Sequence, residues 1–167
     1  AVVKLISLIK EKFPKIPVIL GGEHISAMPE FSLITSKANF VVMGEGEETI
    51  IELIKEMKGE NNFKKVEGIG YKNNNQIVIN NRRRRRQKID NISYPDWNSF
   101  NVKGYHENRF VGGMYSNKLT IPILATRGCP YQCTYCSAPN MWLPLWIPRD
   151  PVCVVNEIEY YIKKFGA

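Results

Sequence analysis

Three of the chain's four cysteines lie within eight positions, in the stretch TRGCPYQCTYCSAP at residues 126–139. Cys129, Cys133 and Cys136 have the spacing C-x₃-C-x₂-C. Thiolates bind zinc and iron–sulfur clusters, whereas thiols can also pair as disulfides or pack as small hydrophobic groups. Most of what the sequence predicts about function depends on which of these roles the three cysteines have.

A disulfide within the trio would leave one cysteine unpaired, and nothing else in the sequence indicates secretion. Structural zinc usually takes four ligands, and the candidates for a fourth are Cys153, His24 and His106. An iron–sulfur cubane held by three thiolates fits the spacing best. It leaves one iron open to a substrate or cofactor, as a catalytic centre requires.

The loop resembles the cluster loop of the radical S-adenosylmethionine enzymes, because Cys129-x₃-Cys133-x-Tyr135-Cys136 matches their C-x₃-C-x-aromatic-C motif. The resemblance implies a 4Fe–4S cluster on the three cysteines, with S-adenosylmethionine chelating the open iron and Tyr135 against its adenine. It also implies reductive cleavage to a 5′-deoxyadenosyl radical, an external one-electron reductant and a small-molecule substrate. The sequence identifies no further catalytic residue.

Four earlier stretches, VILGGEHISAMPE, VVMGEGEETIIEL, VEGIGYK and YPDW, resemble the cobalamin-binding domain and linker of cobalamin-dependent radical S-adenosylmethionine proteins. Gly21 and Gly22 end the first apolar segment, and Gly44 and Gly46 follow the second. Glycines there let a bulky ligand approach the backbone, although turn geometry explains them equally well. The resemblance implies cobalamin at these glycines, and methyl transfer or a rearrangement as the reaction.

Apolar periodicity predicts an α/β fold with alternating helices and buried strands. The expected elements are a helix at 2–13, a strand at 17–22, a short helix at 26–35, a strand at 39–43, a helix at 47–58 and a β-hairpin within 65–80. This order predicts a doubly wound layer, the C-terminal part of a Rossmann-like domain.

We therefore expect three parts: a truncated cobalamin-binding-like domain at 1–80, a linker at 81–118 and the start of a radical S-adenosylmethionine barrel at 119–167. The barrel part comprises a strand at 119–126, the cysteine loop and a helix at 151–165. Val155, Ile158, Ile162 and Phe165 are predicted to form the buried face of that helix. The chain begins without Met, inside a helical pattern, so we expect a fragment that is inactive by itself.

The formal net charge is +7, and the run Arg82–Arg86 supplies five of the positive charges. No aromatic residues interleave with these arginines as base-stacking platforms would, so nucleic-acid binding is not expected. We interpret the run as a solvated loop. Because the sequence has no apolar stretch long enough for a membrane span and no signal peptide, we expect a cytoplasmic protein.

Two other functions would use parts of the same sequence. A zinc-stabilised nucleic-acid-binding module would combine the arginine run with four cysteine ligands. A methylthiolating radical enzyme acting on tRNA shares the cluster motif, but it needs an N-terminal domain with its own cysteines. Residues 1–80 contain none.

Several other residues have plain structural interpretations. His24 lacks the D-x-H-x-x-G context of a cobalt ligand, so we expect it to form hydrogen bonds near the strand end. Cys153 fits a buried small hydrophobe at a helix start. Glu45 and Glu47 stabilise a helix N-terminus without any ligand. Trp142 and Trp146 are expected to cover the barrel. The role of Arg149 is left open.

Overall fold

The computed structural model describes residues 1–74, 76–107 and 119–167. It divides into two compact units: residues 1–86 with 128–145, and residues 87–127 with 146–167. The linker expected at 81–118 lies partly outside the described residues.

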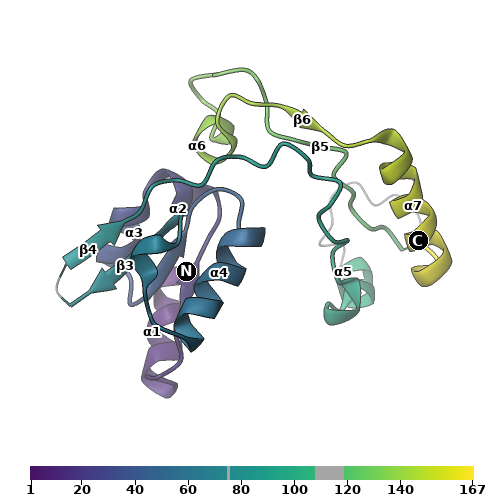
Figure 1. The fold of residues 1–167 in the computed structure, drawn as a ribbon. Coiled ribbons are helices and arrows are strands. Elements are labelled where there is room, and N and C mark those ends of the chain that lie inside the picture. Colours follow the sequence, from purple (N-terminus) through teal and green to yellow (C-terminus); the bar gives the residue numbers. More distant parts are fainter. Residues whose placement is uncertain (75, 108–118) are drawn as a thin grey trace. The chain divides into compact units, whose positions relative to one another are not determined.

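The first unit is built on a four-stranded sheet in the order β1-β2-β3-β4 (Figure 1). Its strands are β1 (Ile19–Leu20), β2 (Phe40–Val42), β3 (Ile69–Asn73) and β4 (Gln76–Ile79). β1 and β2 are parallel, and the other two pairings are antiparallel. The predicted hairpin is confirmed, and it extends the sheet on the side of β2.

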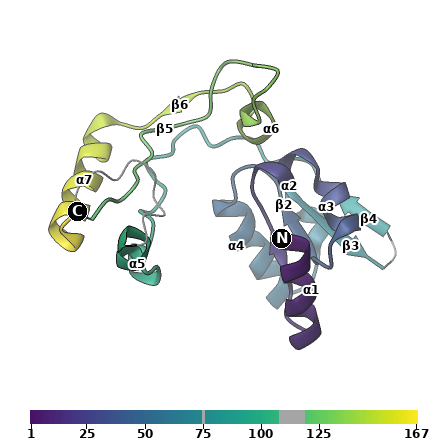
Figure 2. The same ribbon diagram turned by 180° about the vertical axis from the view of Figure 1, so that it is seen from behind.

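Helices cover both faces of this sheet (Figures 1 and 2). Along β2 the side chains alternate, so that Phe40 and Val42 pack with Leu53 of α4 (Glu47–Lys58), while Val41 packs with Leu33 on the opposite face. Leu33 belongs to α3 (Pro29–Thr35), which follows α2 (Glu23–Ala27). The remaining helices of the unit are α1 (Val2–Lys12), the 3₁₀ helix η1 (Phe63–Lys65) and α6 (Ala138–Trp142).

Gly70 in β3 shows how tightly the second face is packed. A Cβ at this position would lie 2.6 Å from Cδ1 of Ile79 and 2.8 Å from Cγ2 of Val41. Glycine in the centre of a strand marks such a close approach. The layer of α3 can therefore lie directly on the sheet.

The second unit contains a short antiparallel ladder between β5 (Thr126–Arg127) and β6 (Ile147–Pro148). It also contains the 3₁₀ helix η2 (Trp97–Ser99), α5 (Val102–Glu107) and α7 (Pro151–Phe165). The Asp150 side chain accepts a hydrogen bond from Val152 N (2.7 Å) and caps α7, with Pro151 at its first position. The predicted helix at 151–165 has these bounds. No helix in the described part of the chain has the length and apolar character needed to span a membrane.

Two expected elements differ from the structure in extent. The helix expected at 26–35 is two helices, because Met28 leaves the helical region (φ −133°, ψ 59°) ahead of Pro29, as the residue before a proline tends to do. Of the strand expected at 119–126, only residue 126 pairs, together with Arg127. Apolar character alone does not make a strand, which needs a ladder partner.

The predicted buried face of α7 is wrong for Val155, Ile158 and Ile162, whereas Phe165 is partly buried. Val155 and Ile162 are 52% and 53% exposed, whereas the residues that α7 buries are Glu157 and Tyr161. These two lie four residues apart on another stripe of the helix, where Arg149 and Tyr94 pack against them. Partner side chains, and not the apolar stripe, decide which face is buried within this unit.

Candidate cluster-binding loop

The three cysteines lie on one loop of the first unit, immediately after β5. All three are free thiols; Cys129 is partly buried, and Cys133 and Cys136 are exposed. The loop begins at Gly128, whose φ of +84° is a left-handed conformation that side chains rarely adopt. Glycine at this position therefore allows the chain to turn from the strand into the cysteine loop.

A tight turn brings Cys133 and Cys136 together in the backbone, since Cys136 N donates to Cys133 O at 3.1 Å. Ala138 N donates to Cys136 Sγ at 3.4 Å. Hydrogen bonds to ligand sulfurs are one factor that sets the reduction potential of an iron–sulfur cluster. Three free soft ligands on one loop, one of them already receiving an N–H bond, are a donor set that fits such a cluster.

Within the described ranges, no three His, Cys, Asp or Glu side chains converge closely enough to hold a metal ion. Tyr135 lies between two of the cysteines and is 90% exposed. With this exposure, the ring is accessible to a molecule that binds at the loop.

The second half of the loop packs on the end of the sheet where β1 and β2 stop. α6 lies against α2, and Ser137 Oγ donates to Glu23 Oε2 at 2.7 Å. Ser26 connects the two segments, because its hydroxyl lies 3.3 Å from Met141 Sδ and accepts a hydrogen bond from Gly44 N at 2.8 Å. The cysteine loop and the glycines after β2 are thus neighbours.

The four candidate cobalamin glycines differ in what surrounds them. Gly22 (φ +109°) has open space where a Cβ would be, and Gly44 (φ +71°) has Met141 O and Arg82 Nη2 at 3.8 Å. Gly21 and Gly46 meet only ordinary contacts at 3.8 and 3.7 Å. Backbone conformation is thus sufficient to explain glycine at Gly22 and Gly44, and their role toward cobalamin stays a prediction.

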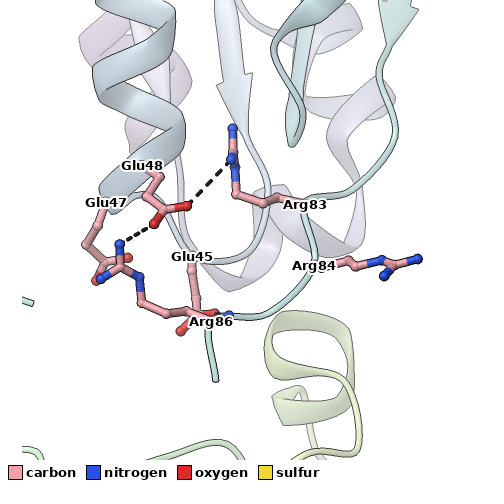
Figure 3. Close-up of a pocket in the computed structure, with 6 residues that line it drawn as sticks. All are labelled: Glu45, Glu47, Glu48, Arg83, Arg84 and Arg86. Atoms are coloured by element: carbon pink, nitrogen blue, oxygen red, sulfur yellow. Dashed lines mark hydrogen bonds and ion pairs between the residues drawn. The ribbon is translucent and has the colours of Figure 1, made fainter. Parts of the chain in front are cut away.

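The interpretation of Arg82–Arg86 as a solvated loop is wrong. Arg83 pairs with Glu48 (3.5 Å) and with Glu52. Arg86 pairs with Glu48 as well, as Figure 3 shows. The run forms ion pairs with the first turns of α4, because Glu48 and Glu52 are four residues apart on one helix face. That acidic spacing was visible in the sequence and could have predicted the contact.

Glu45 and Glu47 flank the start of α4 in the same pocket (Figure 3). Glu45 Oε2 accepts a hydrogen bond from Arg86 N at 3.0 Å and lies 3.5 Å from Arg85 Nε. The arginine run thus compensates the charge of Glu45, which needs no external ligand. Glu47 retains its predicted place at the helix N-terminus.

His24 and Cys153 were also named from the sequence. His24 is exposed on α2, and its backbone carbonyl accepts a hydrogen bond from Met28 N at 2.9 Å. Cys153 is partly buried in the first turn of α7. Burial and the nearby carboxylates of Asp90 and Asp150 raise the pKa of the Cys153 thiol. A raised pKa disfavours the thiolate that a metal ligand must supply.

The remaining residues named from the sequence are Trp142, Trp146 and Arg149. Trp142 lies under the Arg85 guanidinium, and Trp146 is about half exposed in the second unit. Arg149, whose role the sequence left open, forms ion pairs with Glu157 and with Asp90 (3.6 Å). Its role within the second unit is to neutralise a buried carboxylate.

No family model matches the chain. Individual proteins do match it. The anaerobic magnesium-protoporphyrin IX monomethyl ester cyclase of Synechocystis sp. is 29% identical over 168 residues, covering 99% of this chain and 32% of the relative. The cyclase of the same name from Cereibacter sphaeroides is 30% identical, covering 93% of this chain and 25% of the relative. The chain thus spans about a third or less of these relatives' length.

Among solved structures, the radical S-adenosylmethionine methyltransferase TsrM from Kitasatospora setae has a similar fold. With tryptophan and an S-adenosylmethionine analogue bound, it gives a TM-score of 0.71 at 20% identity, covering 96% of this chain and 30% of TsrM. A second TsrM structure, with cobalamin and a [4Fe-4S] cluster bound, gives 0.65 at 19% identity. The chain is therefore similar in sequence to these cyclases and similar in fold to a radical S-adenosylmethionine methyltransferase, which confirms the resemblance predicted from its cysteine motif and its four earlier stretches.

Proposed function

We propose that the chain is the cofactor-binding part of a radical S-adenosylmethionine enzyme, with Cys129, Cys133 and Cys136 as ligands of a 4Fe–4S cluster. The observation that carries this proposal is the set of three free cysteines spaced C-x₃-C-x₂-C on one loop. The homology to cyclases over 99% of the chain supports it.

The domain assignment follows the same reasoning. Residues 1–80 would form the later part of a cobalamin-binding domain, residues 81–118 a linker, and residues 119–167 the first strand, loop and helix of the barrel. The proximity of the cysteine loop to Gly44 supports a shared site, because Gly44 N and Met141 both contact Ser26. Cobalamin would lie at Gly21, Gly22, Gly44 and Gly46.

When bound, the cluster supplies the electron that cleaves S-adenosylmethionine to a 5′-deoxyadenosyl radical, and cobalamin supplies a methyl carrier. The chain's own residues bind and orient these groups. The thiolates of Cys129, Cys133 and Cys136 would hold the cluster, and with only three ligands from the protein it would keep a position for S-adenosylmethionine. The exposed Tyr135 ring is available to stack on the adenine.

For the intact protein we propose methyl transfer, cyclisation or a related rearrangement on a small-molecule substrate, with an external one-electron reductant. The relatives include both a methyltransferase and cyclases. The arginine run does not favour the rival nucleic-acid-binding function, because Arg83, Arg85 and Arg86 are paired with carboxylates of their own chain.

The ligand assignment is tested by anaerobic reconstitution of the chain with iron and sulfide. Cys133→Ala should lose the brown chromophore and most of the bound iron, since two thiolates cannot hold the cluster. Cys153→Ala is the matched control and should keep both, because Cys153 is not among the proposed ligands. Iron content and visible absorbance are the measurements. Iron retained in Cys133→Ala, or iron lost in Cys153→Ala, would overturn the assignment.

A further inference from the structure

Arg85 is a largely buried member of the arginine run, with its side chain only 5% exposed. A buried guanidinium is costly unless charge and hydrogen-bond partners surround it. Glu45, itself 11% exposed, supplies the charge at 3.5 Å from Arg85 Nε. This distance makes an ion pair, although Nε has no hydrogen-bond partner among the described residues.

The hydrogen bonds of Arg85 go to the cysteine loop. Its Nη1 donates to Trp142 O at 2.8 Å and to Leu145 O at 2.6 Å, and its guanidinium lies 5.1 Å from the Trp142 ring centroid. Trp142 is the last residue of α6, where carbonyls lack partners within the helix. One side chain thus caps the helix and binds the segment that follows it.

Gly128, at the start of the loop, lies against Leu145 O and Arg85 Nη1. A Cβ on Gly128 would lie 2.1 Å from Leu145 O and 2.6 Å from Arg85 Nη1. The first contact is with backbone, so it cannot be relieved by a side-chain rotation. The residue that precedes Cys129 and the residue that ends the loop are therefore held together at Arg85.

The neighbouring arginines fix the run in place. Arg82 Nη2 donates to Asn140 O and to Met141 O (3.3 Å), so Arg82 and Arg85 both face the loop. Arg83 and Arg86 face α4 instead. Arg84 points away from the carboxylates in Figure 3 and is exposed. Arg82 and Arg85 bind the loop while Arg83 and Arg86 bind α4, so the run connects the loop to α4.

We propose that Arg85 is a positioning residue that closes the cysteine loop on the first unit, by binding Trp142 O and Leu145 O beside Gly128. The inference rests on the proposed function, since the loop's task of holding the cluster belongs to it. The hydrogen bonds of Arg85 go to backbone carbonyls of the loop and not to its cysteine sulfurs. It acts through the backbone at the two ends of the loop.

Hydrogen exchange on the full chain without iron tests the closure directly. In Arg85→Ala the amides of residues 128–145 should exchange about tenfold faster, because two partly buried carbonyls lose their donor. Amides of β2 and β3 should exchange as in the wild type. Arg84→Ala is the matched control and should leave residues 128–145 unchanged.

Arg85→Lys separates charge from geometry, because an ammonium keeps the charge next to Glu45 but lacks the planar fork. The proposal predicts faster exchange in this milder variant too. It also predicts less iron bound and a broadened EPR spectrum of the reduced cluster, a signal that a general stability loss does not produce. Wild-type exchange in Arg85→Lys, or equal loss of protection in β2 and the loop, would overturn the proposal.

The loop closure and the cluster assignment can fail independently of each other. If the loop opens in Arg85→Ala while Cys133→Ala still binds iron, the closure stands and the cluster assignment falls. If Cys133→Ala loses iron while the loop of Arg85→Ala stays protected, the cluster assignment stands and the closure falls.

Discussion

Glu157 is a carboxylate buried to 3% exposure on α7, and two polar side chains compensate it. Arg149 forms an ion pair with it, and Tyr161 Oη donates to Glu157 Oε1 at 2.6 Å. A hydrogen bond to a buried charge contributes more than one between neutral groups. The Tyr161 ring also packs against Tyr94, with centroids 6.1 Å apart. This cluster, and not the apolar stripe, anchors α7 within the second unit.

The same contacts predict an alkaline pH dependence. Burial, and then the bond to Glu157, raise the pKa of Tyr161 to about 12, from an ordinary value of 10.0. A raised pKa in the folded state means that the neutral phenol stabilises the fold. This contribution is fully present below pH 10 and is lost as the pH rises toward 12.

Tyr161→Phe should therefore destabilise the protein at neutral pH by about 1–3 kcal/mol, because Glu157 loses a donor. It should also remove the part of the alkaline stability loss that comes from Tyr161. Denaturant unfolding from neutral pH to pH 12 measures both effects. Tyr160→Phe is the control, since Tyr160 is partly exposed. Identical pH profiles for wild type and Tyr161→Phe would contradict the interpretation.

At the scale of elements, α4 contributes both the core of the first unit and the acidic face that the arginine run binds. Leu53 is fully buried against the sheet, whereas its neighbour Ile54 is 41% exposed. Both residues are large and apolar. The structure places only Leu53 in the core cluster with Phe40 and Ile69.

Leu53→Ala should cost about 2–5 kcal/mol of unfolding free energy, through lost transfer energy and the cavity left behind. Ile54→Ala, on the same helix and of similar size, should cost much less because Ile54 is already partly hydrated. Chemical denaturation of the two variants gives the comparison. Equal losses would mean that α4 is rotated from the orientation described.

Several elements were predictable because their signals are local. Pro14 and Gly59 mark the ends of α1 and α4, and Asp150 with Pro151 marks the start of α7. The elements that were not predicted depend on partners distant in sequence. The short β5 depends on a ladder with β6, and the buried Glu157 depends on Arg149. A charged residue inside an apolar pattern gives no sign that it will be buried.

At the scale of the whole molecule, the cysteine motif predicted the resemblance to radical S-adenosylmethionine enzymes, and the four earlier stretches predicted the resemblance to the cobalamin-dependent proteins among them. The similarity in fold to TsrM supports both. The placement of the cysteine loop was not predictable. Residues 128–145 pack with residues 1–86, more than 40 positions earlier, through Arg85 and Ser26. A run of like charges predicts mutual repulsion and exposure unless the acidic partners are considered together with it.

The central claim is that three cysteines bind a 4Fe–4S cluster and leave one iron open. The most direct test is the EPR spectrum of the reconstituted, reduced chain with and without S-adenosylmethionine. An open iron predicts a changed spectrum on addition, because the amino and carboxylate groups become ligands. A spectrum that does not change, or a protein that holds zinc in place of iron after anaerobic purification, would contradict the account.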